Sequence, residues 1–411
     1  MVKLSKGSQW QFVLIAMCLG IIVGFVLGPS AKPLGYVGSV FLNLIRMVTV
    51  PMIFFTILYG ITSMDSSSSL YRVSFKAIIV FITTSVIAVV IGIVVTQLLE
   101  PGVGLSRSLL EEFKGSTQLP KINDIRGFDI ILSLIPGNIF ESLSNGHILQ
   151  IIVFAMFIGF ILNANRDKSE LLIKIIHQSA LLFFEVIKII MKLAPFGVFG
   201  YISAMVGVDG ISVLVALGKL VLAVFIGCLV QYMVFGIIIT FGARLSPIPF
   251  YRKILGPQLI AFATSSSKAT LVPLMEVSEN KMGISRESSR FILPLSAALN
   301  MDGGAIYQAS AAVFFAQMMG VVFSPGDYIT ILLMCTLASI GGAGIPGGVL
   351  LFLGMVLNAL NLPIEGVLLV ASVDRLLDMM TTVINVTGCA SATLLIDRSE
   401  NKLDVDRYKS T

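Results

Sequence analysis

The sequence predicts an all-α polytopic membrane protein with eight transmembrane helices and two re-entrant helical hairpins. Of its 411 residues, 56% are hydrophobic and only 12% are charged, whereas soluble globular domains carry about 25% charged residues. The mean hydropathy is +0.95. Most apolar residues form runs that approach or exceed the roughly 20 residues needed to cross a bilayer. Two further apolar stretches are interrupted at their centres by serines or glycines, which predicts the hairpins.

The first half of the chain contains most of the uninterrupted runs. Spans are predicted at residues 10–27, 37–61, 77–99, 181–206 and 213–241. Residues 100–129 form a polar loop, and residues 163–174 form a basic loop. Residues 130–162 are apolar but punctuated by Pro136, Gly137 and Gly146, which predicts several helical pieces.

The second half predicts broken helices. Residues 249–281 have Thr264–Lys268 at their centre, and neither half is long enough to cross a bilayer. Residues 291–322 are interrupted at 300–304. Residues 328–360 have a run of glycines and a proline at 339–348. Because non-helical backbone survives at membrane depth only where protein buries it or where it lines a cavity, these breaks predict a site.

The last apolar run, residues 363–395, carries a polar stripe. Its members follow at steps of four, four, three and four, which places them on one helical face: Asp374, Asp378, Thr382, Asn385 and Cys389. A charged group at the centre of a membrane helix costs at least roughly 2.5–3.5 kcal/mol. The stripe therefore faces a protein interior or cavity, and it favours a site for a cation or an ammonium group.

The pattern of hairpin followed by helix occurs twice, at 249–322 and 328–395. Two interrupted segments in corresponding positions indicate a transporter site between repeats. Half-helix N-termini would receive a substrate carboxylate. Unwound carbonyls at 300–304 and 339–342 would replace the water around a cation.

Loop charge predicts the orientation. The predicted outer connections at 207–211, 322–327 and 361–365 carry no Lys or Arg, whereas both tails and the predicted inner loops do. We therefore expect both termini in the cytoplasm. The four cysteines lie singly in apolar runs and the two histidines are isolated, so no disulfide framework, bound metal centre or covalent cofactor is expected.

Four motifs in this order resemble the dicarboxylate/amino acid:cation symporter family, which includes glutamate and neutral amino-acid transporters. They are Ser265-Ser266-Ser267, Asn300-Met301-Asp302-Gly303, the stretch from Gly341 to Gly347, and Asp378 with Asn385-Val386-Thr387-Gly388. The resemblance covers the whole chain. It implies a homotrimer in the inner membrane, with scaffold segments at 1–76 and 130–206. It also implies an elevator-like transport domain formed by 207–411 and by the helix within 77–129.

The resemblance also implies functional residues. Asp378 resembles the carboxylate that binds the substrate amino group, and Thr382 and Asn385 match contacts to the α-carboxylate and amino group. The implied substrate contacts are Ser265, Ser266, Ser267, Met301, Gly304, Ile345, Asp378, Thr381, Thr382 and Asn385. The implied cation contacts are Thr84, Ser85, Ser296, Asn300, Asp302, Ser339, Gly342, Asn385 and Cys389.

Several positions depart from the family pattern. Members with acidic substrates place an arginine where this chain has Thr381, and often a threonine at Gly304. Many bacterial members have an arginine at Ser265. Cys389 replaces a carboxylate at one sodium site, and a neutral thiol is a poor ligand for a hard cation. Lys268 adds a positive charge after the hairpin serines, either at the membrane edge or near the substrate.

We therefore expect a secondary transporter, not an enzyme, that carries a small neutral amino acid in symport with Na⁺ or H⁺. The alternative is a proton- or sodium-coupled symporter of glutamate, aspartate or a dicarboxylate. Because of Cys389, fewer sodium ions are expected than in members with the full acidic set. A channel and an intramembrane protease fit less well, because two gating hairpins argue against a simple pore. In addition, Asp374 and Asp378 lie one turn apart on a single helix.

Overall fold

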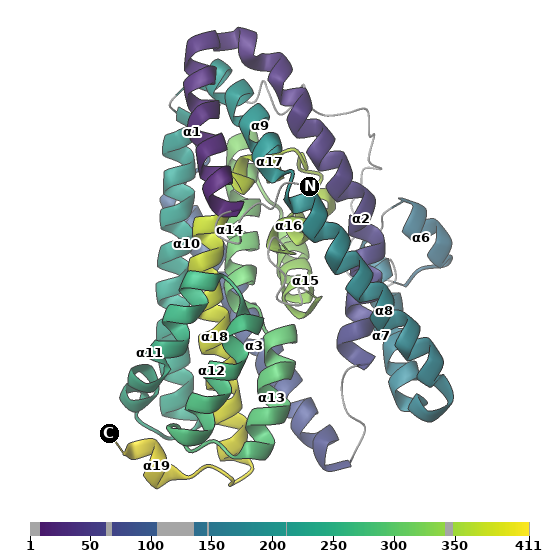
Figure 1. The fold of residues 1–411 in the computed structure, drawn as a ribbon, viewed down its shortest axis with the longest axis vertical. Helices are drawn as coiled ribbons and strands as arrows, with labels where there is room; N and C mark the ends of the chain where they lie inside the picture. Colours follow the sequence, from purple (N-terminus) through teal and green to yellow (C-terminus); the bar gives the residue numbers. More distant parts are fainter. Residues whose placement is uncertain are drawn as a thin grey trace, which may run out of the picture.

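The computed structural model describes residues 9–62, 68–104, 135–145, 148–210, 212–341 and 348–410. Throughout these residues the regular structure is helical, with no strand (Figure 1). Within them, four helical stretches are long and apolar enough to cross a membrane: Ile15–Phe41, Arg72–Leu99, Ser212–Gly242 and Asp374–Ser399. The all-helical class predicted from the sequence is therefore confirmed, while the number of spans stays a prediction.

The N-terminal half departs from the prediction around residues 163–206. Its elements are α1 (Gln9–Leu27), the 3₁₀ helix Gly28–Leu34, α2 (Gly35–Thr62), α3 (Ser68–Leu99), α6 (Ile139–Asn145), α7 (Ile148–Ala164), α8 (Arg166–Met191) and α9 (Ala194–Asp209). The basic loop predicted at 163–174 is wrong, because α8 begins at Arg166. Its charges pair along the helix, as Lys174 does with Glu170 at 2.6 Å. The single span predicted at 181–206 is broken just before Pro195, which lies in the first turn of α9.

The C-terminal half has the predicted broken pattern. Its elements are α10 (Ser212–Ile237), a π-helical turn (Ile238–Gly242), α11 (Pro247–Thr264), α12 (Ser267–Asn280), α13 (Arg286–Leu299), α14 (Asp302–Met319), α15 (Pro325–Gly341), α16 (Gly348–Ala359), α17 (Gly366–Ala371), α18 (Asp374–Ser399) and α19 (Val405–Lys409).

The first predicted hairpin is formed by α11 and α12, which pack against each other. Ser265 ends α11 in the left-handed conformation, with φ 48° and ψ 43°. The hydroxyl of Ser266 caps α12 by accepting a hydrogen bond from the Ala269 N–H at 3.2 Å. In the second hairpin α15 packs against α16, and the connecting residues 342–347 lie outside the described part of the chain.

The two breaks in the long helices differ in detail from the prediction. The predicted interruption at 300–304 is narrower, because α14 begins at Asp302 and only Asn300 and Met301 are non-helical. The run at 363–395 contains a break that the sequence did not reveal, at Ser372 and Val373 between α17 and α18. No glycine or proline marks this second break.

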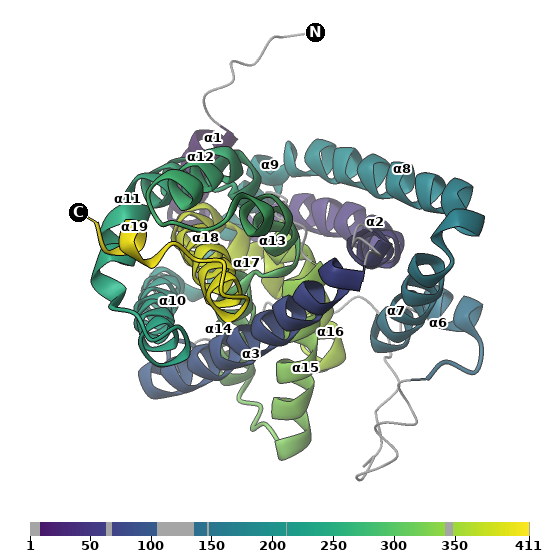
Figure 2. The same ribbon diagram turned by 90° about the horizontal axis from the view of Figure 1, so that it is seen from below.

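Helix α18 lies at the centre of one packing group. It contacts α3, α10, α11, α12, α13 and α14, which surround it when the molecule is seen from below (Figure 2). A second group is formed by α1, α2, α7, α8 and α9. Contacts of α9 with α10 and α17, and of α2 with α15, join the two groups. The polar stripe of α18 therefore faces other helices, as its charges require.

The base of the first hairpin is held by the C-terminal tail. The Lys253 ammonium donates hydrogen bonds to the backbone carbonyls of Lys281, Arg407 and Tyr408 at 2.8–2.9 Å. The buried Tyr408 donates to the Ser246 carbonyl at 2.7 Å. The tail thus ties the two ends of the hairpin together.

Glycine 303 sets the distance between α14 and α18. A β-carbon at Gly303 would lie 2.2 Å from the carbonyl oxygen of Thr381, well inside van der Waals contact. The close approach also lets the Gly303 N–H donate to the Asn385 side-chain oxygen at 2.8 Å. Only glycine allows this crossing, so a larger residue must push the helices apart.

We expect Gly303→Ala to lower the free energy of unfolding by about 1–3 kcal/mol, the usual cost of overpacking. Gly218→Ala is the matched control, because a β-carbon on Gly218 meets nothing within 4 Å. Thermal unfolding of the purified proteins in detergent measures both. Equal midpoints for the Gly303 variant and the control would show that the helices accommodate the methyl group.

Candidate functional site

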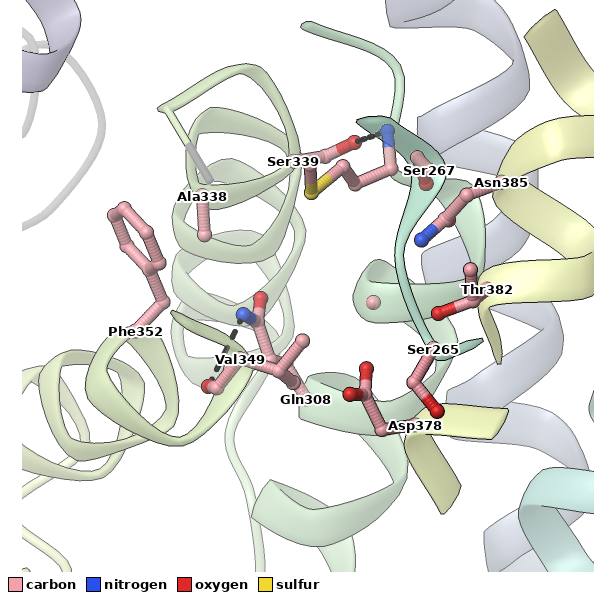
Figure 3. Close-up of a pocket in the computed structure, with 12 residues that line it drawn as sticks. Ser265, Ser267, Gln308, Ala338, Ser339, Val349, Phe352, Asp378, Thr382 and Asn385 are labelled. Atoms are coloured by element: carbon pink, nitrogen blue, oxygen red, sulfur yellow. Dashed lines mark hydrogen bonds between the residues drawn. The ribbon is translucent and has the colours of Figure 1, made fainter. Parts of the chain in front are cut away.

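A cavity lies between the two hairpins and α18. The space between its atoms, counted together with the solvent at its opening, is about 430 Å³. Its lining residues come from both hairpins, from the α13–α14 break and from α14, α16 and α18 (Figure 3). They are Ser265, Ser267, Met301, Gly304, Gln308, Ala338, Ser339, Val349, Phe352, Asp378, Thr382 and Asn385.

Three residues of the α18 polar stripe face this cavity. Asp378, Thr382 and Asn385 follow one another along one side of the helix, and their polar atoms point into the open space (Figure 3). Asp378 is the one charged side chain among the lining residues. The cavity is therefore suited to a ligand that brings a positive group to Asp378 and hydrogen-bonding groups to its neighbours.

The orientation of the Asn385 amide is fixed by the backbone of α14. Its oxygen accepts the hydrogen bond from Gly303, which turns the amide nitrogen toward the cavity as a donor (Figure 3). Beside Thr382 and Asp378, the Ser265 hydroxyl is buried and has no hydrogen-bond partner among the described residues (Figure 3). The Gln308 side-chain oxygen is likewise buried and without a partner, while its nitrogen donates to the Val349 carbonyl at 3.4 Å. Unsatisfied polar atoms of this kind are suited to binding a polar ligand.

A cluster of oxygen atoms lies behind the cavity around Asp302. This carboxyl group is fully buried. Its Oδ1 accepts a hydrogen bond from the Ser85 hydroxyl at 2.8 Å and lies 3.2 Å from the Thr84 hydroxyl. The Thr84 hydroxyl also lies 3.3 Å from the Asn300 side-chain oxygen. Oδ2 of Asp302 has no hydrogen-bond partner. Carboxylate, amide and hydroxyl oxygens are the ligands that hard cations prefer.

Ser339 connects this cluster to the cavity. Its hydroxyl accepts from the Met301 N–H at 2.9 Å and lies 2.9 Å from the Ser85 hydroxyl. Because Ser85 donates to Asp302, the Ser339 hydroxyl donates to Ser85. A continuous chain of hydrogen bonds therefore runs from Met301 through Ser339 and Ser85 to Asp302. Met301 and Ser339 both line the cavity.

The remaining predicted residues are placed as follows. Gly304 and Ser267 line the cavity, whereas Ser266 and Thr381 do not. The Ser266 hydroxyl caps α12, and Thr381 is fully buried with its hydroxyl donating to the Asp378 carbonyl at 3.3 Å. Ser296 and Cys389 are buried on the adjacent helices α13 and α18. Gly342 and Ile345 lie outside the described residues.

Sequence reasoning missed Gln308 and the apolar wall. Gln308 follows Gly304 by one helical turn, so this spacing was a usable signal for a side chain on the same face. Ala338, Val349 and Phe352 line the cavity from the second hairpin, and no pattern distinguishes them from ordinary core residues. Asp374, the first acid of the stripe, does not line the cavity. Its carboxylate instead accepts a hydrogen bond from the buried Tyr307 hydroxyl at 2.9 Å.

Helices broken at the middle of an apolar bundle, around a polar cavity and a buried oxygen cluster, define a secondary transporter. The model for the sodium:dicarboxylate symporter family matches residues 10–399. The chain therefore belongs to that family, which consists of symporters rather than enzymes.

Relatives of known function agree with this assignment. A proton/sodium-glutamate symport protein of Geobacillus stearothermophilus is 33% identical over 414 residues, covering 98% of this chain and 97% of the relative. A C4-dicarboxylate transport protein of Bacillus subtilis is 34% identical over 406 residues, covering 98% and 96%. These relatives are named for glutamate and C4-dicarboxylates and not for small neutral amino acids. They favour the alternative substrate class over the one first expected from the sequence.

We expect Asp302→Asn to lower the apparent affinity for sodium in uptake by roughly tenfold or more. A tenfold loss corresponds to about 1.4 kcal/mol of binding free energy. The amide keeps the size of the side chain but removes the negative charge from the oxygen cluster. Uptake into proteoliposomes, measured against sodium concentration at fixed pH, tests this. Asp327→Asn is the control, because Asp327 only caps a turn at Ser324. An unchanged sodium dependence in the Asp302 variant would mean that the cation binds elsewhere.

Proposed function

We propose that this protein carries an acidic amino acid, glutamate or aspartate, into the bacterial cell in symport with Na⁺ or H⁺. The cavity formed by the hairpins and α18 would hold the substrate, and the oxygen cluster around Asp302 would hold a coupling cation. Ser296, Asn385 and Cys389 are candidates for a further cation contact. We expect fewer coupled sodium ions than a carboxylate in place of Cys389 would support, because a thiol is a poor ligand for sodium.

The observation that carries the proposal is that Met301 and Ser339 belong both to the cavity lining and to the hydrogen-bond network of Asp302. A cation bound at Asp302 would fix the Ser85 and Ser339 hydroxyls and, through them, the backbone of Met301. Substrate and cation would therefore each favour the same arrangement of the second hairpin, which is the coupling that symport requires.

Asp378 favours an amino acid over a simple dicarboxylate. The half-buried Asp378 carboxylate faces the cavity and favours a positive group there, and the ammonium group of an amino acid supplies one. A C4-dicarboxylate without an amino group would instead bring a second negative charge toward Asp378. Among the substrates for which the relatives are named, glutamate therefore fits this cavity better.

A small neutral amino acid is the second candidate. Asp378 is the one charged residue that lines the cavity, and Thr381 stands where an arginine would be expected for an acidic substrate. A neutral substrate would need no further positive charge. Direct competition between the two substrate classes separates the candidates.

We further propose that the two packing groups are the parts that move against each other. The group of α1, α2, α7, α8 and α9 would be the scaffold. It corresponds to the predicted segments 1–76 and 130–206, except that residues 68–76 belong to α3. The group around α18, with α3, would be the transport domain, and three copies would assemble through their scaffolds. The division of helix contacts supports this proposal, because few elements bridge the groups.

We expect uptake of labelled aspartate into proteoliposomes to depend on an inward sodium or proton gradient and to saturate. Glutamate should compete, and serine and alanine should compete weakly. Varying the two gradients separately, and recording the charge moved per substrate, identifies the coupling ion. Uptake of serine that excess aspartate does not inhibit would refute the acidic substrate and support the neutral one. Flux that is independent of both gradients would refute symport.

We expect Asp378→Asn to abolish the uptake of amino acids, because removing one partner of a buried charge pair costs roughly 3–5 kcal/mol. Succinate, which has no ammonium group, should not lose affinity in this variant. Binding of aspartate and succinate to the purified protein, measured by calorimetry in saturating NaCl, provides the comparison. Near-normal aspartate affinity in the variant would show that the ammonium group binds elsewhere.

A further inference from the structure

The cavity supplies no positive charge for the second carboxylate of an acidic amino acid. In the proposed function, Asp378 would match the substrate ammonium. The Asn385 amide, the Thr382 hydroxyl and the ends of the hairpin helices would match the α-carboxylate. A side-chain carboxylate buried in the same space needs a partner of its own. That partner must come from a cationic residue just outside the lining.

Arg375 is placed to reach this position. It precedes Asp378 by three residues on α18, so the two side chains leave the same face of the helix one turn apart. Its Nη2 lies 3.5 Å from the carbonyl oxygen of Ala263, two residues before the cavity-lining Ser265. The guanidinium group therefore spans the gap between α18 and the end of α11, beside the Ser265 and Asp378 side of the cavity.

One edge of the guanidinium group is only partly engaged by the part of the chain that the structure describes. Within that part, its Nε is buried and has no hydrogen-bond partner. The Nη2 contact with Ala263 is at the outer limit of a hydrogen bond. Nε and Nη2 form one edge of the planar guanidinium, and that edge matches the two oxygens of a carboxylate. A purely structural role as a cap for α11 would leave the buried Nε unexplained.

The other cation nearby is less suitable. Lys268 lies on α12 directly after the lining residue Ser267, but its side chain is exposed on the surface of the hairpin. An ammonium group also presents no planar edge to a carboxylate. Arg375 is only partly exposed, and α18 positions it relative to Asp378.

We propose that Arg375 binds the side-chain carboxylate of the substrate through Nε and Nη2, and so determines the preference for acidic over neutral amino acids. This inference rests on the proposed function. In this chain the arginine is supplied from the start of α18, next to the first hairpin, rather than from position 381. The same guanidinium would link the bound substrate to Ala263, so an acidic substrate would help to hold the first hairpin against α18.

Calorimetric binding of aspartate and of its neutral isostere asparagine, in saturating NaCl, tests the proposal. In Arg375→Gln the aspartate affinity should fall about tenfold or more, the loss expected for a hydrogen-bonded charge. Asparagine affinity should change far less, so the ratio of the two affinities should fall. Arg375→Lys, which keeps the charge but loses the planar edge, should be intermediate. A structural defect would instead weaken both ligands and lower the unfolding temperature.

Arg398→Gln is the matched control. Arg398 also lies on α18, and its Nε donates to the Ala243 carbonyl at 3.3 Å, far along the helix from the cavity. This variant and Lys268→Gln should keep the wild-type ratio of affinities. Equal losses for both ligands in Arg375→Gln, or a selective loss in Lys268→Gln instead, would overturn the assignment. If the unmodified protein binds asparagine or serine but no acidic amino acid, the proposed function fails, and this inference fails with it.

Discussion

The buried carboxyl group of Asp302 is the constraint on which the core of this protein depends. A carboxyl group without water must be satisfied by protein groups or by a cation. Thr84 and Ser85 reach it from α3, and Ser339 extends the same network from the second hairpin. Three elements far apart in the sequence are therefore held at one point. Asp302 is the first residue of α14, so the break at Asn300 and Met301 lies directly beside this network.

The close crossing of α14 and α18 places α18 directly beside the Asp302 network. Gly303 lies directly after Asp302, and its missing β-carbon lets the Thr381 carbonyl approach. The same approach brings Asn385 to the Gly303 N–H and turns its amide nitrogen toward the cavity. Gly388, one turn further along α18, lies against Asn300 and Asp302, where a β-carbon would be 3.0 Å from the Asn300 amide. Two glycines thus bring the cavity-lining face of α18 close to the oxygen cluster around Asp302.

Much of this arrangement could be predicted from the sequence. The spacing from Asp374 to Cys389 places these residues on one helical face whatever surrounds the helix. The polar residues around Ser265 and Asn300 predict breaks, because they interrupt runs that are otherwise apolar. The break at Ser372 could not be predicted, because neither Ser372 nor Val373 is a helix-breaking glycine or proline. The start of α8 at Arg166 was missed because its charged first turns have the composition of a loop, although they form helix with Glu170 and Lys174 paired. The apolar wall of the cavity could not be predicted from the sequence. Phe352 and Val349 are ordinary core residue types, and only their position in the fold places them at the cavity.

The order of charges along α18 fits the proposal that one helix contacts both the substrate and the coupling cation. Arg375 and Asp378 lie in its first turns beside the first hairpin, Thr382 and Asn385 follow in the middle, and the neutral Cys389 lies deeper, near Ser296. Groups that match a charged organic substrate therefore precede groups that face the cation cluster. Asn385 stands between them, since its oxygen is committed to Gly303 and its nitrogen to the cavity. In the proposed symport, a substrate that accepts a hydrogen bond from this nitrogen would act on the turn that begins at Asp302. The selectivity of the cavity and the strength of cation binding would then be adjusted through the same residue.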